Sequence, residues 1–213
     1  TAANAAVVNQ ASLYFAQLRR YRVSVSLSLA GQVFWDADAP QGGLTRASDA
    51  LESLAAWRRE RLADLPAHDA MHLLTGLELS GESLGLAAVQ SACDRTEQCG
   101  ATEEGSCLFR SGELVGCCRR RAASLSVATP DATWSAQLVS HELGHQLGLV
   151  HDDSSCAASR ATSLMHQYVH DPASNASMGW SQCSLDTFAG LLIQPRDATG
   201  FHPFGCMLNP PGQ

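Results

Sequence analysis

The sequence contains no lysine, no long hydrophobic run and no low-complexity segment. Its 14 permanently cationic side chains are all arginine, and the formal net charge of −7 argues against nucleic acid as the main partner. No apolar stretch approaches the roughly 20 residues that a membrane-spanning helix needs. With 213 residues and an ordinary apolar fraction, the chain suits one globular domain.

No signal peptide opens the chain, and Thr1 onward reads as a mature or trimmed start. Cysteine usage says more about the compartment, because an even count with five residues between 93 and 118 favours disulfide bonds in an oxidising environment. A structural zinc site is the alternative, but the cluster lacks paired C-x-x-C spacing. The sequon at Asn175 fits export, so we expect a secreted or extracellular glycoprotein, or the ectodomain of a larger protein. The eight cysteines are Cys93, Cys99, Cys107, Cys117, Cys118, Cys156, Cys183 and Cys206.

Hydrophobic periodicity predicts alternating helices and strands in the first half of the chain, which indicates an α/β layer. The third predicted helix opens near Thr129, with Pro130 in its first turn. The second and third predicted strands look like neighbours, and residues 93–121 are predicted to be a loop region bound by cysteines. The predicted helices are 4–20, 46–63, about 129–147 and 184–193, and the predicted strands are 22–29, 70–79, 84–89 and 123–128.

The second half of the chain has no strand pattern. We expect it to form an irregular subdomain held by cysteines 156, 183 and 206. The predicted organisation is therefore one domain over residues 1–213, with an upper subdomain over about 1–148 and a lower one over about 149–213.

The segment HELGHQLGLVHDD, residues 141–153, has the spacing of a metal site. His141 and His145 are four residues apart on a predicted helix, so their rings project from one face. Gly148 stops that helix, because glycine adopts the left-handed conformation that turns the chain sharply. The turn brings back His151 as a third ligand. Three neutral imidazoles leave a fourth tetrahedral position for water, which indicates a catalytic zinc rather than a structural one.

Glu142 lies about 100° around the helix axis from His141. It is too displaced to be a third ligand but close enough to hydrogen-bond a metal-bound water. Zinc acidifies such a water and polarises a scissile carbonyl, and Glu142 would carry the proton to the leaving amine. The remaining histidines are expected to be ordinary surface or core groups, because three ligands are already supplied: His68, His72, His166, His170 and His202.

The string His141-Glu142-x-x-His145-x-x-Gly148-x-x-His151 resembles the metzincin zinc signature. Asp152 follows this string directly. An aspartate at this position resembles the pattern of the adamalysin or reprolysin branch, which includes the snake-venom metalloproteinases and the ADAM and ADAMTS proteases. The resemblance implies a twisted mixed β-sheet with helices in an upper subdomain, and a small irregular lower subdomain ending in a helix. It also implies a secreted zinc endopeptidase that acts on polypeptides, with a prodomain or protein inhibitor as a further partner.

The same resemblance assigns roles around the zinc. Asp152 supports the fold beneath the site, and Met165 falls where adamalysins place a methionine turn, with Met178 as the other candidate. A peptide substrate would add itself antiparallel to an edge strand at 85–89, and the segment 167–170 would line the pocket for the residue after the cut. The substrate-binding residues implied in this way are Gly85, Leu86, Ala87, Gln167 and Tyr168.

The resemblance also implies a disulfide between Cys156 and Cys183. Cys206 would tie the C-terminus back to the sheet through Cys93 or a cysteine of the region that follows it. Calcium is a second expected ion, because Asp69, Cys206 and Asn209 match three family ligands. The fourth ligand is a glutamate on a first strand that has no counterpart here, so either the sequence begins after that strand or another segment fills its place.

A binding protein that keeps the protease fold without cleaving, such as a toxin or decoy, is the alternative function. Such proteins commonly lose the general base or a metal ligand. Glu142 and the three histidines are all present, and this favours the enzyme.

Overall fold

The computed structural model shows a mixed α/β fold, as the sequence predicts. It describes residues 2–21, 24–35, 39–40, 42–81, 83–92, 107–110, 113–117, 122–152, 156, 163–167, 178–194, 204 and 207. The elements, in chain order, are α1 (Ala2–Ala16), the 3-10 helix η1 (Gln17–Tyr21), α2 (Ala47–Arg61), β1 (Met71–Thr75), β2 (Gly85–Ala87), β3 (Cys107–Arg110), β4 (Glu113–Cys117), β5 (Ala123–Val127), α3 (Ala132–Gln146) and α4 (Gln182–Leu192).

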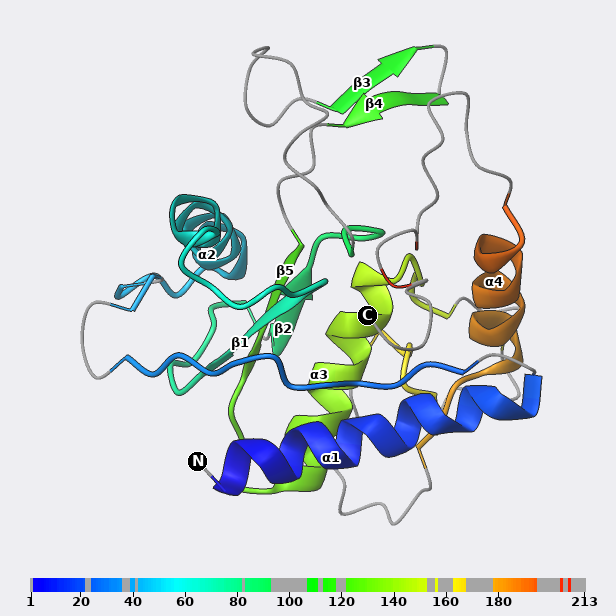
Figure 1. Cartoon of the computed structure of the whole chain (residues 1–213), viewed down its shortest axis with the longest axis horizontal. Coiled ribbons are helices and arrows are strands. Elements are labelled where there is room, and N and C mark those ends of the chain that lie inside the picture. Colours follow the sequence, from blue (N-terminus) through cyan, green and yellow to red (C-terminus); the bar gives the residue numbers. More distant parts are fainter. Residues whose placement is uncertain are drawn as a thin grey trace.

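The central sheet has the strand order β1-β5-β2 (Figure 1). β1 runs parallel to β5, whereas β2 runs antiparallel to it, with Leu86 opposite Leu125. The strands predicted at 70–79 and 84–89 are therefore present, but the prediction that they are neighbours is wrong because β5 lies between them. Within the described part of the chain β2 has a partner on one side, so its other side is an edge.

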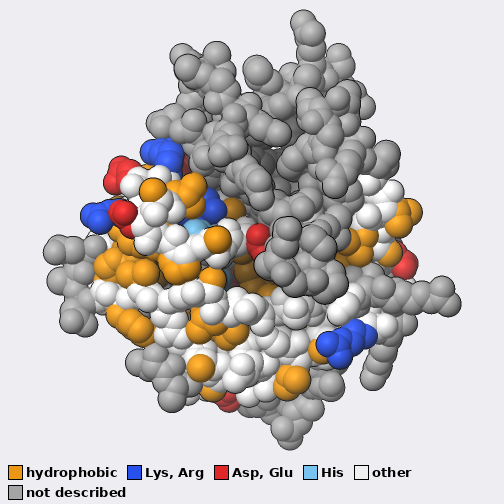
Figure 2. Space-filling model, in the orientation of Figure 1, with side chains coloured by type: hydrophobic (Ala, Val, Ile, Leu, Met, Phe, Trp, Pro, Cys, Tyr) orange, Lys and Arg blue, Asp and Glu red, His pale blue; other side chains and the backbone are white. Residues whose placement is uncertain are grey.

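Helices cover both faces of this sheet. Leu125 of β5 belongs to an aliphatic cluster with Leu51 and Leu54 of α2. Its neighbour Ser124 points the other way, as the two-residue period of a strand requires, and meets Gln146 of α3. The outer side of α2 carries most of the charged side chains on the described part of the face shown in Figure 2, so the helix predicted at 46–63 is present and amphipathic.

A second core joins α1, α3 and α4. Phe15 of α1 is fully buried, and its ring centroid lies 5.1 Å from that of Trp180. The indole N–H of Trp180 donates to the carbonyl of Tyr14, which satisfies its polar end inside the core. Burial of each large apolar side chain of this kind stabilises the fold by about 1.5–3 kcal/mol, and residues of α1, α3 and α4 share this core.

The predicted strand at 22–29 is wrong over its described part, residues 24–29, which pair with no strand. The alternation is nevertheless reflected in burial, because Val25 and Leu27 pack against the core of α1, α3 and α4. The Ser12 hydroxyl donates to the Leu27 carbonyl at 3.5 Å, so this segment runs beside α1 instead of beside a strand. Alternating burial alone cannot distinguish these two neighbours.

Two further predictions need correction. The region 93–121, predicted to be a loop, contains the antiparallel pair β3–β4. The third helix begins after Asp131, whose side chain caps it, so Pro130 lies outside the first turn. None of the helices in the described ranges is long and apolar enough to cross a membrane.

Candidate metal centre

Helix α3 carries two of the three histidines, and hydrogen bonds from side-chain and backbone groups define both ends of this helix. The Asp131 carboxylate accepts hydrogen bonds from the backbone N–H groups of Thr133 and Trp134, at 2.6 and 3.1 Å. At the other end Gly148 has φ +97°, and its N–H donates to the carbonyl of His145. The N–H of Leu149 donates to the carbonyl of Gly144, which completes a glycine-terminated helix end.

Gly148 also lies close to α4. A Cβ at this position would lie 2.8 Å from a methyl carbon of Leu191, so that leucine would have to shift, and the φ of +97° is the stronger requirement for glycine. The chain therefore turns sharply against α4 and returns His151 to the two histidines of α3, as the spacing predicts.

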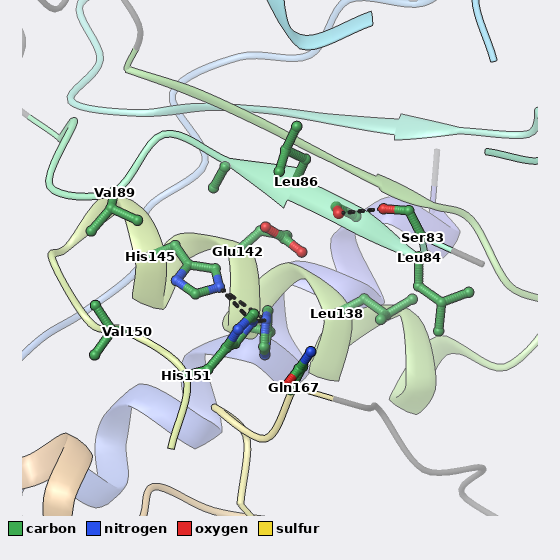
Figure 3. A pocket seen from close by; sticks show the side chains of 13 residues that line it. Ser83, Leu84, Leu86, Val89, Leu138, Glu142, His145, Val150, His151 and Gln167 are labelled. Atoms are coloured by element: carbon green, nitrogen blue, oxygen red, sulfur yellow. Dashed lines mark hydrogen bonds between the residues drawn. The ribbon is translucent and has the colours of Figure 1, made fainter. Parts of the chain in front are cut away.

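The three imidazoles converge through their Nε2 atoms (Figure 3). The Nε2 of His141 lies 3.1 Å from that of His145 and 3.2 Å from that of His151. The remaining Nε2 pair, between His145 and His151, is also 3.2 Å apart. A tetrahedral zinc with bonds of about 2.0–2.1 Å would place its nitrogen ligands about 3.3 Å apart, so the spacing fits this ion.

Backbone carbonyls fix the orientation of two rings. The Nδ1 of His141 lies 2.5 Å from the carbonyl oxygen of Leu164, and the Nδ1 of His145 lies 2.8 Å from that of Leu149. A carbonyl only accepts, so each Nδ1 carries the proton and each Nε2 presents a lone pair. Two lone pairs 3.1 Å apart cannot hydrogen-bond each other. A shared cation is the partner that satisfies both of them.

The rings are held in the neutral form that binds a metal. Burial, and then the proximity of His145, lower the pKa of His141 to about 3. Burial also lowers the pKa of His145, and it lowers that of His151 against the opposing pull of Asp152. Neutral imidazoles at physiological pH leave their lone pairs free for a divalent ion.

Glu142 lies in the same cleft and is 4% exposed. Burial raises its pKa to about 8, and its Oε2 has no hydrogen-bond partner among the described residues. A nearby cation would favour the carboxylate form and lower this pKa again. Figure 3 shows the carboxyl group between the histidines and the strand that bears Leu86.

Gly85 of β2 makes room for that carboxyl group. A Cβ on Gly85 would overlap Oε1 of Glu142 and lie 2.8 Å from the carbonyl oxygen of Leu125. Sequence reasoning assigned Gly85 to substrate binding and missed its contact with the acid. A glycine inside a strand is the available signal, because it often marks a close approach of another group.

Met165 lies beneath the metal site and is fully buried. A Cβ at Gly144 of α3 would be 2.8 Å from the Met165 sulfur and 3.1 Å from the Trp180 ring, so this glycine admits both side chains. Met178 packs at the edge of the same core. Gly144 was also missed, although a glycine inside a helix costs about 1 kcal/mol relative to alanine and usually has a packing reason.

Asp152 fastens the chain immediately after the third histidine. Its carboxylate accepts hydrogen bonds from Ser163, from Ser181 at 2.7 Å and from Ser184 at 3.1 Å. Its N–H donates to the carbonyl of Met165 at 2.9 Å. Because the Ser181 side chain also caps α4, Asp152 ties the segment after His151 to the methionine turn and to α4. A disulfide joins Cys156 to Cys183 of α4, which is the pair that the resemblance implies.

The cleft over the three histidines has a volume of about 540 Å³. Gly85, Leu86, Ala87 and Gln167 line it, as the resemblance implies. Tyr168 lies outside the described residues, as do Cys206, Asn209 and the sequon at Asn175. Asp69 is exposed, and the calcium site stays a prediction. Val89, the last residue of the predicted edge strand 85–89, also lines the cleft, and the lining residues outside the predicted segments are Ser83, Leu84, Leu138 and Val150.

His68 and His72 make ordinary contacts, whereas His166 lies close enough to His141 and His151 to lower the pKa of both rings. The ring nitrogens of His72 lie 2.7 Å from the hydroxyl of Ser124 and 2.9 Å from that of Ser126. Arg58 donates to His68 at 2.9 Å. In the described part of the chain, the cluster of three imidazoles is the one group able to hold a metal ion.

Two imidazoles on α3 converge with a third from the segment after it, beside the edge strand of a mixed sheet, and together they define an α/β domain with a candidate metal centre. The model of metallopeptidase family M12, of the reprolysin type, matches residues 2–186, and the chain belongs to this family, which confirms the resemblance. The chain is similar to a zinc metalloproteinase/disintegrin of Bitis gabonica, with 25% identity over 184 residues. That alignment covers 86% of this chain and 47% of the snake protein, so the chain spans about half the length of this curated relative.

Proposed function

We propose that this chain is the catalytic domain of a secreted, zinc-dependent endopeptidase that cuts extended polypeptides. The observation that carries the proposal is the set of three Nε2 atoms, each 3.1–3.2 Å from the others, beside the buried acid Glu142. The proposal is supported by membership of the M12 family and by the similar zinc metalloproteinase/disintegrin.

In the proposed mechanism His141, His145 and His151 hold the ion, and Glu142 moves the proton. The chemistry that zinc supplies in such a site is Lewis acidity, which lowers the pKa of a coordinated water and polarises a carbonyl. The Glu142 carboxylate takes the proton of the attacking water and delivers it to the leaving amine. Glu142 can act in this way because it is held in the cleft without a competing partner among the described residues.

The edge of β2 that has no partner strand among the described residues would bind the substrate. An extended peptide antiparallel to residues 85–87 would hydrogen-bond the backbone groups on the side of this strand that faces away from β5. The peptide would then lie across the three imidazoles, because the strand and α3 line the same cleft. Affinity would come from main-chain bonds and selectivity from the side chains that line the cleft.

The proposed organisation is a single catalytic domain over residues 1–213, with its lower subdomain beginning after Gly148. The disulfide between Cys156 and Cys183 supports an oxidising compartment and therefore secretion. A prodomain or protein inhibitor remains a proposed partner.

Hydrolysis of a quenched peptide library by the zinc-loaded chain tests the proposal. We expect turnover that a chelator abolishes and added zinc restores. Glu142→Gln should lower kcat by about 10²–10⁴-fold while the bound zinc, measured by elemental analysis, is unchanged. Glu60→Gln, at an exposed carboxylate of α2, is the matched control and should keep full activity.

Two results would contradict the proposal. Turnover that survives complete removal of metal would exclude the zinc mechanism. A fully metallated sample that cuts no peptide would favour the silent binding protein instead.

A further inference from the structure

Two valines stand exposed at one end of the cleft. Val89 is 40% exposed and Val150 is 60% exposed, although both are β-branched apolar residues. Both line the cleft, and Figure 3 shows them on either side of His145. Leu138, Ser83 and Gln167 lie toward the other end.

Backbone hydrogen bonds hold both valines in place. Directly after Val89, the N–H of Gln90 donates to the carbonyl of His145 at 2.8 Å, and Gln90 adopts φ +54°, which is unusual for a residue with a side chain. Val150 lies between Leu149, whose N–H bonds a carbonyl of α3, and Asp152, whose N–H bonds Met165. The two side chains are therefore presented from a fixed backbone and cannot easily turn inward.

Among the described residues, no side chain at this end of the cleft carries a charge that could pair with one on a substrate. Among the described residues that line the cleft, Glu142 is the one acid, and it lies at the centre beside the histidines. A charged substrate side chain between the valines would lose its hydration without gaining a partner, which is costly. An aliphatic or aromatic side chain would instead remove its own apolar surface and that of the valines from water, which is favourable.

The direction of β2 indicates which part of a substrate reaches the valines. β2 runs from Gly85 to Ala87 and continues toward Val89, and an antiparallel peptide runs the opposite way. Its residues before the scissile bond therefore lie toward Val89, and its residues after the bond lie toward Leu84.

We infer that Val89 and Val150 form a subsite that selects an apolar residue among the three positions preceding the bond that is cut. This inference rests on the proposed function, because it assigns a specificity to the same cleft.

The test compares cleavage-site profiles of the zinc-loaded chain and its variants on one peptide library. We expect apolar residues to exceed acidic ones about tenfold at one of the three positions before the cut. Val89→Thr and Val150→Thr keep the shape of the side chain and should each reduce this preference. Val89→Glu should replace it with a preference for arginine and lysine. Val33→Thr is the matched control, because Val33 is 45% exposed but does not line the cleft, and its profile should equal that of the native chain.

A binding measurement gives a readout that does not need turnover. Zinc-loaded Glu142→Gln should bind a peptide with leucine before the cut about tenfold more tightly than the same peptide with aspartate, and adding Val89→Glu should reverse the order. Unchanged profiles and affinities in all the valine variants would overturn the inference, as would changes confined to positions after the cut. Failure of the native chain to cut any peptide would instead count against the proposed function, and the binding order would still decide the inference.

Discussion

The α2 face of the sheet is largely aliphatic, whereas the α3 face is polar. On the first face Leu125 packs in a cluster with Leu54 of α2. On the second, Ser124 accepts a hydrogen bond from Gln146 of α3 at 2.6 Å and also contacts the ring of His72. Apolar contacts between a helix and a sheet stabilise the fold but are not directional. Hydrogen bonds are directional, so they specify the position and orientation of the helix on the sheet. The polar face lies under the helix that carries the metal ligands, where position matters most.

The largest expected effect tests the aliphatic face. Leu54→Ala removes a fully buried side chain and should lower the free energy of unfolding by about 2–5 kcal/mol. Urea denaturation measures this loss, and kcat of the folded fraction should stay unchanged because Leu54 lies away from α3. Leu54→Met is the control of similar volume and should cost less than about 1.5 kcal/mol. A large fall in kcat for Leu54→Ala would remove the distinction between the two faces.

The next effect tests the polar face. Gln146→Leu leaves the Ser124 hydroxyl and the Met71 carbonyl without the amide that bonds them, and should destabilise the chain by about 1–3 kcal/mol. Because Gln146 follows His145 directly, this variant should also lose zinc to a chelator more readily than Leu54→Ala does. Chelator competition at matched stability measures the difference. Equal zinc retention in the two variants would show that the polar contacts do not position the ligand.

The smallest effect concerns pH. Burial lowers the pKa of His72 to about 3, below its ordinary value of 6.5. Between about pH 3 and pH 6.5 the His72 ring is therefore protonated in the unfolded chain but neutral in the folded chain. Its contribution to the free energy of unfolding is complete above about pH 6.5 and is lost as the pH falls toward 3. The free energy of unfolding, measured at several pH values, should change less steeply with pH in His72→Gln than in the native chain. The difference should be less than about 1.4 kcal/mol per pH unit, since His72 is partly exposed. Leu54→Ala should keep the native slope while losing stability at every pH.

The metal centre was largely predictable because its spacing is local. His141 and His145 share one helix face by helical geometry, and Gly148 has the positive φ that its position predicts. The helices and most strands were also predictable, since each depends on its own periodicity.

What escaped prediction depends on contacts between distant segments. β5 lies between β1 and β2, and the sequences of the three strands do not determine this order because other pairings are equally compatible with them. The space that Gly85 leaves for Glu142 joins residues 57 positions apart, and neither residue signals the other. Residues 24–29 have the alternating pattern of a strand, but they run beside helix α1 instead of pairing with a strand.

The Nδ1 atom of His141 donates a hydrogen bond to the backbone carbonyl of Leu164, and that of His145 donates to the backbone carbonyl of Leu149. No amino-acid replacement deletes a main-chain oxygen, so point mutation cannot directly remove either acceptor. The orientation of both rings is thus inherited with the path of the chain, and altering it would require an insertion, a deletion or a proline that reroutes the loop.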